Sequence, residues 1–303
     1  MPARMARAAA PARSGRRQSN GVEVDMAGMD AQEWQGRVGK SWAHEWQRTD
    51  RSFSHLTAEL ERRILALEFT HALDVGCGAG ELSLKVARQR PAADVIGVDV
   101  SPDLIEVARE RAGNAPNLSF ELADAAAWQP DAGARPDLLM SRHGVMFFPD
   151  PVAAFANLRA ATASGAQMLF SCFREVSENP FFGEAGRLIP AEPGTPPPDP
   201  HAPGPFAFAD NARVESVLSD AGWRDIRFEP FDFAMIAGAG DDPIADAVSY
   251  FSRIGPAARA LAGMDDAARA EVQGKLAELA GRNLKDGIVS LGAGVWIVSA
   301  THN

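Results

Sequence analysis

Short apolar runs alternate with segments of helical periodicity along most of the chain from about residue 55. The apolar runs predict buried strands at 71–76, 94–100, 118–124, 136–142 and 166–173. Apolar residues at helical spacing predict the intervening helices at 56–68, 81–91, 101–113 and 151–162. Ser101 and Asp150 are typical N-cap residues, and each is followed by a proline, which helices tolerate at their first position. This alternation predicts an α/β fold with a doubly wound, mostly parallel sheet.

The last part of the chain changes this rhythm. Residues 190–205 contain eight prolines, which exclude a helix or an internal strand and predict an extended surface loop. After this loop we expect a helix at 209–222, strands at 224–236 and 293–302, and a mostly helical stretch at 243–283. The sheet therefore has seven predicted strands, and the segments 174–208 and 240–290 interrupt the alternating pattern as insertions.

Composition and charge exclude several classes of protein. The 303 residues carry a net charge of −10, although residues 1–20 hold five arginines and no acid, so the remainder is strongly acidic and repels nucleic acid and anionic membranes. No apolar run is long enough to cross a bilayer. The two cysteines, Cys77 and Cys172, provide no disulfide framework, and no metal-ligand spacing occurs. We expect a cytoplasmic protein without a metal, with a disordered basic tail at 1–28 and a single domain at 29–303.

A glycine motif follows the first strand directly, in the stretch ALDVGCGAGELS at 72–83. It is not a phosphate-binding P-loop, because glutamate and leucine follow Gly80 where that loop needs lysine and then serine or threonine. A dinucleotide site is an alternative, since Asp99 ends the second strand 19 residues after Gly80. Asp74 argues against it, because a carboxylate two residues before the first glycine repels a pyrophosphate and suits a cationic ligand without phosphates.

Three successive strands end in carboxylates, at Asp74, Asp99 and Asp124. In a parallel sheet these strand ends lie at one edge, which is where open α/β folds bind ligands. By the order and spacing of four motifs, the chain resembles the class I S-adenosylmethionine (SAM) methyltransferases. The motifs are LDVGCGAG (73–80), VIGVDVS (95–101), FELADA (120–125) and PDLLMSRHGVMFFPDP (136–151).

The resemblance covers about residues 30–303 and implies a Rossmann-like sheet whose last strand is antiparallel. Two further segments, 34–46 and 140–161, resemble the small-molecule (type 11) branch that is related to the quinone-biosynthesis C-methyltransferases. The Asn/Asp-Pro-Pro-Tyr/Phe segment of nucleic-acid amino methyltransferases is absent after the fourth strand. The resemblance therefore implies a small-molecule substrate and no nucleic-acid partner.

The resemblance also implies a role for particular residues in binding SAM. The glycine loop would pass closest to the cofactor, Asp74 would lie near its amino-acid end, and Asp99 would bind the ribose hydroxyls. The full set of implied cofactor-binding residues is Asp74, Gly76, Cys77, Gly78, Gly80, Asp99, Val100, Asp124, Ala125, Ser141, Arg142 and Trp42. Asp124 and Ala125 would address the adenine, and Ser141 and Arg142 would line the pocket at the end of the fourth strand.

Several side chains outside these motifs have both a functional and a structural interpretation. Trp34, Trp42 and Trp46 fall on one face of a predicted helix, which suits core packing or a cover over the cofactor. His143 follows the fourth strand and is a candidate catalytic base, because imidazole titrates near neutral pH. Four phenylalanines flank the proline loop and form either an apolar substrate wall or an anchor for the loop: Phe181, Phe182, Phe206 and Phe208.

The sequence therefore predicts SAM-dependent methyl transfer to a small apolar or aromatic metabolite. The insertions 174–208 and 240–290 would cover the substrate, and the nitrogen, oxygen or carbon acceptor stays open. A SAM-binding protein of the same fold without catalysis and an NAD-dependent oxidoreductase are the alternatives. The sequence leaves the oligomeric state open.

Overall fold

The computed structural model describes residues 31–131, 135–189 and 199–303. The basic tail predicted at 1–28 and most of the proline-rich segment lie outside the described residues, and the expectations about them stay predictions.

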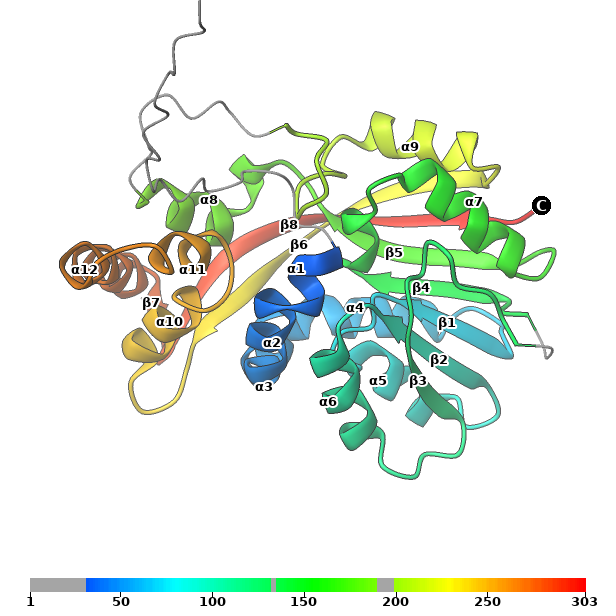
Figure 1. The fold of residues 1–303 in the computed structure, drawn as a ribbon, viewed down its shortest axis with the longest axis horizontal. Helices are drawn as coiled ribbons and strands as arrows, with labels where there is room; N and C mark the ends of the chain where they lie inside the picture. Colours follow the sequence, from blue (N-terminus) through cyan, green and yellow to red (C-terminus); the bar gives the residue numbers. More distant parts are fainter. Residues whose placement is uncertain (1–30, 132–134, 190–198) are drawn as a thin grey trace, which may run out of the picture.

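A single twisted sheet organises the described part of the chain (Figure 1), with strand order β3-β2-β1-β4-β5-β8-β6. Its strands are β1 (His71–Val75), β2 (Asp94–Asp99), β3 (Leu118–Leu122), β4 (Leu138–Arg142), β5 (Gln167–Phe173), β6 (Arg224–Gly238) and β8 (Ile288–Thr301). The first five strands pair in parallel, and β8 is antiparallel to both β5 and β6. All seven predicted strands are present, so the predicted α/β fold is confirmed.

One short strand was not predicted. β7 (Leu284–Lys285) pairs with the start of β8 and makes the sheet eight-stranded. Asp286 and Gly287 connect the two strands, with φ of 50° and 78°. An Asp-Gly pair with positive φ is the turn that a two-residue hairpin favours, because its twist matches that of the strands.

Helices cover both faces of the parallel strands. In Figure 1, α7 (Pro151–Ala161) and α9 (Asn211–Asp220) lie on one side, and α4 (Ser54–Ile64), α5 (Glu81–Gln89) and α6 (Pro102–Ala112) lie on the other. Ser101 and Asp150 cap α6 and α7 as predicted, accepting hydrogen bonds from the third residue that follows each of them. Strands covered on both faces have little polar surface, which explains the apolar runs in the sequence.

The insertion between the last two strands consists of three helices, α10 (Pro243–Phe251), α11 (Pro256–Leu261) and α12 (Asp266–Arg282). It follows β6, which extends with β8 beyond the parallel strands (Figure 1). The segment after β5 contains the 3₁₀ turn η2 (Val176–Glu178) and α8 (Pro180–Arg187), and α8 contacts α11, α12 and β8. The two insertions thus form one helical layer at the far end of the long strands.

The N-terminal segment forms three short helices, α1 (Ala31–Gln35), α2 (Arg37–His44) and α3 (Trp46–Ser52). The prediction that Trp34, Trp42 and Trp46 share one helix face is wrong, because the chain breaks at Gly36 and at Glu45. The rings of Trp34 and Trp42 are 5.6 Å apart, whereas the Arg111 guanidinium lies 4.0 Å from the centre of the Trp46 ring. Trp34 and Trp42 therefore pack against each other, whereas Trp46 packs against Arg111.

The N-terminal helices sit directly on the start of α6. A Cβ atom on Gly39 of α2 would lie 2.2 Å from the Ser101 hydroxyl oxygen, so only glycine allows this approach. α3 also contacts the long strand β6. The N-terminal segment is thus placed over the carboxyl edge of the sheet, where the predicted site lies.

Candidate functional site

The glycine loop joins β1 to α5, and its three glycines have different roles. All three have positive φ, a conformation that L residues rarely adopt. A Cβ on Gly76 would lie 2.6 Å from the Gly144 Cα, and a Cβ on Gly80 would lie 2.6 Å from the Phe120 ring, so packing within the protein requires both. A Cβ on Gly78 would meet no atom within 4 Å. Gly78 is therefore the glycine of this loop with free space beside its backbone.

Asp99 connects this loop to the end of β2. One carboxylate oxygen accepts a 2.9 Å hydrogen bond from the Gly78 backbone N–H, and the other accepts a 2.9 Å bond from the Ser101 N–H. Burial raises the pKa of the Asp99 carboxyl, and the two backbone donors act in the opposite direction. Each carboxylate oxygen can accept a second hydrogen bond, so the group is held in place and still able to bind hydroxyls.

Asp74 lies deeper, at the end of β1, and is only 1% exposed. The Ser83 hydroxyl of α5 donates a 2.5 Å hydrogen bond to it. Burial raises the pKa of Asp74 to about 6, and the Ser83 bond and nearby Arg142 oppose this shift. The carboxyl is therefore poised to ionise when a cation binds next to it.

Ser141 and Arg142, both predicted to line the cofactor pocket, already have protein partners. The Ser141 hydroxyl donates to the Val75 carbonyl at 2.6 Å and accepts from the Gly144 N–H at 3.0 Å, which ties β4 to β1. The Arg142 guanidinium forms an ion pair with Glu81 and donates to the Thr57 hydroxyl at 2.6 Å. In the described structure these residues stabilise the edge of the sheet.

The remaining predicted cofactor residues surround the loop. Asp124 is exposed and accepts a hydrogen bond from the Ala126 N–H at 2.9 Å, whereas the neighbouring Ala125 is buried. Val100 and Trp42 are half-buried. Cys77 is buried, which raises the pKa of its thiol well above the ordinary value and leaves the sulfur uncharged.

An ion pair that the sequence did not predict, between Asp50 and Arg111, connects α3 to the glycine loop. Arg111 of α6 donates to the Ala79 carbonyl in the loop at 2.6 Å and to the Asp50 carboxylate of α3 at 2.6 Å. Burial, and then the nearby Glu81 charge, raise the pKa of Asp50 to about 6. Asp50 and Arg111 are 61 residues apart and belong to no motif, so no sequence signal could have found the pair.

His143 follows β4 with φ of 66°, a left-handed conformation that is unusual for a residue other than glycine. Its ring is stacked on Phe173, with 4.1 Å between the ring centres and 12° between the planes. Neither ring nitrogen has a hydrogen-bond partner. Burial, and then the positive charge of Arg142, lower the pKa of His143 to about 3. The imidazole is therefore neutral at physiological pH and a much weaker base than the sequence led us to expect.

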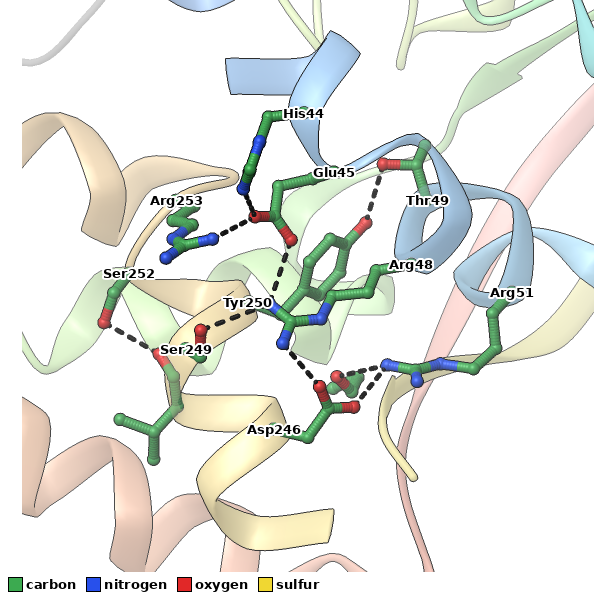
Figure 2. A network of polar contacts seen from close by, with 12 residues as sticks. His44, Glu45, Arg48, Thr49, Arg51, Asp246, Ser249, Tyr250, Ser252 and Arg253 are labelled. Atoms are coloured by element: carbon green, nitrogen blue, oxygen red, sulfur yellow. Dashed lines mark hydrogen bonds and ion pairs between the residues drawn. The ribbon is translucent and has the colours of Figure 1, made fainter. Parts of the chain in front are cut away.

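A network of ion pairs joins the N-terminal helices to the insertion (Figure 2). Glu45, which is 3% exposed, contacts Arg48 at 2.9 Å and Arg253, just beyond α10, at 2.5 Å. Asp246 of α10 lies between two arginines of α3, at 2.9 Å from Arg48 and 2.7 Å from Arg51. Together, α2, α3 and α10 form a single pinned cover, the name we use below for residues 37–52 and 243–253.

Comparison with known proteins agrees with this geometry. Residues 72–165 match the family model described as a methyltransferase domain, and this range includes β1, the glycine loop, Asp99, Asp124 and His143. This part of the chain is a methyltransferase domain. The match covers about a third of the chain and includes the first, second, third and fourth strands of the sheet.

Curated relatives are similar to about a third of the chain. It is 38% identical over 108 residues to a trans-aconitate 2-methyltransferase of Methylobacterium radiotolerans, covering 36% of this chain and 40% of that protein. It is 32% identical over 101 residues to a malonyl-[acyl-carrier protein] O-methyltransferase of Ilyobacter polytropus, covering 33% of this chain and 37% of that protein. The match thus spans about two fifths of the length of these relatives.

Solved structures show the same fold at low identity. The YcgJ protein from Bacillus subtilis has a TM-score of 0.52 and 18% identity, covering 82% of this chain and 98% of that one. A phosphoethanolamine N-methyltransferase from Haemonchus contortus, solved in complex with SAM, has a TM-score of 0.52 and 15% identity, covering 90% and 60%. These similarities extend the methyltransferase fold from the domain at 72–165 to most of the chain.

Two searches of the described residues complete the description of the site. No described helix is long and apolar enough to cross a membrane. Within residues 31–131, 135–189 and 199–303, no three His, Cys, Asp or Glu side chains come together in a way that would hold a metal ion.

Proposed function

We propose that this methyltransferase transfers a methyl group from SAM to a small apolar or aromatic metabolite. The observation that carries the proposal is the clamped carboxylate of Asp99, held by the N–H groups of Gly78 and Ser101 beside the open backbone of Gly78. This arrangement offers hydrogen-bond acceptors to two ribose hydroxyls and lets the loop approach a nucleoside closely. The methyltransferase domain match and the SAM-bound structural neighbour support the same cofactor.

The other residues at this edge suit the remaining parts of SAM. The exposed Asp124 would be available to the adenine amino group, and the buried Asp74 and Glu81 would lie near the ammonium group of the amino-acid end. The indole N–H of Trp34 is buried without a partner, and its ring is 5.6 Å from that of Trp42. A buried donor without a partner costs stability unless a ligand satisfies it, which supports a ligand beneath α1 and α2.

SAM brings a methyl group on a sulfonium, which is a good leaving group, so the protein need only align the acceptor and exclude water. Phe182 and Phe206, from the segment 174–208, have their rings 5.6 Å apart and both contact Phe173 at the end of β5. They support the interpretation of that segment as an apolar substrate wall. Phe181, Phe182 and Phe208 are all buried in the core, and Phe206 is half-buried.

Calorimetric titration with SAM, S-adenosylhomocysteine and NADH tests the proposal. We expect the first two to bind and NADH not to bind. Asp99→Ala should weaken SAM binding by about tenfold or more, because it removes charge-assisted hydrogen bonds to the ribose. Asp94→Ala is the matched control at the exposed opposite end of the same strand and should leave the affinity unchanged.

The alternatives predict different outcomes. Binding of NADH alone would overturn the proposal and favour an oxidoreductase. Tight SAM binding without turnover on any metabolite extract would favour a SAM-binding protein that does not catalyse. The expectations of a cytoplasmic location, no nucleic-acid or membrane partner, and likeness to the quinone-biosynthesis branch stay predictions.

A further inference from the structure

The His143 ring is a buried polar group that the protein does not satisfy. It is 8% exposed, and both Nδ1 and Nε2 lack a hydrogen-bond partner. The Ser171 hydroxyl is also buried without a partner, and the carbonyl of the same residue accepts the His143 N–H at 3.2 Å. Buried polar groups nearly always have partners, so two unsatisfied side chains at the ends of adjacent strands point to a ligand that supplies them.

The backbone at His143 carries strain as well. Its φ of 66° is one that glycine adopts at little cost, and the next residue, Gly144, packs so tightly that a Cβ on it would lie 2.3 Å from the Val75 carbonyl oxygen. Because position 143 holds histidine and not glycine, the turn after β4 is less stable than it would be with glycine there. Strain at such a position suggests function.

The groups around His143 are phenylalanines from elements far apart in the sequence. Phe53 precedes α4 and lies 5.3 Å from the His143 ring, and Phe173 at the end of β5 is stacked on it. Phe182 of α8 packs against Phe173, and Phe233 of β6 packs against Phe53. We call these residues, with His143, the aromatic cluster.

The arginines next to this cluster in the sequence are all neutralised by carboxylates. Arg51 precedes Phe53 by two residues and pairs with Asp246 at 2.7 Å. Arg142 precedes His143 and pairs with Glu81. The third, Arg174, follows Phe173 and lies 2.7 Å from both Glu178 and Asp232. A carboxylate placed in the aromatic cluster would therefore lose its hydration and would meet only arginines whose charge is already balanced, although the Nε atoms of Arg51 and Arg174 have no partner of their own.

We propose that the methyl acceptor is an uncharged aromatic compound with a hydroxyl group, and that His143 holds this hydroxyl by hydrogen bonds. A neutral imidazole has one N–H donor and one acceptor nitrogen on opposite sides of the ring, and a hydroxyl can donate its hydrogen to the acceptor nitrogen. A carboxylate can only accept, so it could meet the N–H but could not donate a hydrogen to the acceptor nitrogen. The inference rests on the proposed function and separates this chain from relatives that are named for trans-aconitate or malonyl groups.

The transfer balances with the residues present. A bond forms between the acceptor oxygen and the methyl carbon, the bond from that carbon to sulfur breaks, and its electron pair stays on sulfur. The hydroxyl proton passes to the free nitrogen of His143 and from there to water when the product leaves. A weak base is sufficient for this step, because an alkylated oxygen that still carries its proton is strongly acidic.

Binding of two matched compounds to the protein saturated with S-adenosylhomocysteine tests the inference. The compounds are 2-naphthol and 2-naphthoate, which share the ring system and differ in the hydroxyl and the carboxylate. We expect 2-naphthol to bind the wild-type protein more tightly by about tenfold or more. His143→Phe keeps an aromatic ring but removes both nitrogens, and it should weaken naphthol binding about tenfold without changing affinity for S-adenosylhomocysteine.

A second variant guards against misfolding. His143→Asn supplies a donor and an acceptor and tolerates positive φ, so it should fold and recover part of the naphthol affinity. Equal or tighter binding of 2-naphthoate, no measurable binding of 2-naphthol, or unchanged naphthol binding by His143→Phe would each overturn the inference. If S-adenosylhomocysteine itself does not bind, the proposed function fails, and this result is distinct from the other three.

Discussion

The glycines of the loop after β1 differ in how much space surrounds their Cα atoms. Substitution by alanine separates the glycine required for packing from the one that faces open space. Gly76→Ala places a Cβ against the Gly144 backbone, so we expect it to lower the free energy of unfolding by about 2–4 kcal/mol. Gly78→Ala meets open space and costs only the strain of positive φ, about 1 kcal/mol.

Urea denaturation and SAM calorimetry on both variants check this prediction. Gly78→Ala should stay folded and lose SAM affinity, because the added methyl occupies the space beside the loop. If Gly78→Ala binds SAM like the wild-type protein, the ligand does not approach the loop at this residue.

The buried carboxylate of Asp74 lowers the stability of the fold when it is ionised. Its pKa of about 6 in the folded protein lies above the ordinary value of 3.8, so the fold favours the protonated form. The stability that this group contributes is fully present only below the unfolded pKa of 3.8 and is lost as the pH rises from there through about 6. Asp74→Asn keeps an acceptor for Ser83 and removes the buried charge.

We therefore expect Asp74→Asn to raise the melting temperature by roughly 2–5 °C at pH 7.5 and by about half as much at pH 5. The same variant should weaken SAM binding, because the ligand cation loses a carboxylate. Thermal unfolding at both pH values measures the effect, with the exposed Asp94→Asn as control. A melting temperature that falls at pH 7.5 would show that the charge stabilises the fold.

At the scale of elements, the pinned cover connects helices from the two ends of the chain. Glu45 lies between Arg48 and Arg253. Within the described residues it is the only carboxylate that forms an ion pair with Arg253, and Glu45→Ala removes it. Breaking a buried pair is costly, but Arg253 is about half exposed, so we expect a local loss of about 1–3 kcal/mol.

Hydrogen exchange of the pinned cover measures this loss. Amides of residues 37–52 and 243–253 should exchange about tenfold faster in Glu45→Ala. Glu59→Ala is the matched control, because Glu59 pairs with Arg62 and Arg63 within α4 and does not reach the insertion. Equal exchange in both variants would mean that the network does not hold the pinned cover in place.

At the scale of the whole molecule, the site is assembled from distant parts of the chain. The parallel strands bring three carboxylates to one edge, the N-terminal helices lie over that edge, and the insertion after β6 holds those helices in place. Figure 1 shows the insertion at the end of the long strands, beyond the parallel part of the sheet. In the proposed function, the alternating core would provide the cofactor edge, and the added segments would shape the space for the acceptor.

The sequence by itself determined the architecture and the cofactor edge of this protein. Alternating apolar runs and helical spacing predict the seven main strands, Ser101 and Asp150 mark helix starts, and the glycine loop places Asp99 at the edge. These features are local, because the period of a strand or helix and the geometry of a turn depend on residues close together in the chain.

Only the tertiary structure decided which side chains meet. Asp50 with Arg111 and Glu45 with Arg253 are pairs formed by folding, and no pattern along the chain indicates them. The sequence also suggested a base at His143, whereas burial beside Arg142 makes the ring a neutral group without partners. Ionisation and pairing depend on burial and on distances in space, which residues far apart in the sequence set together.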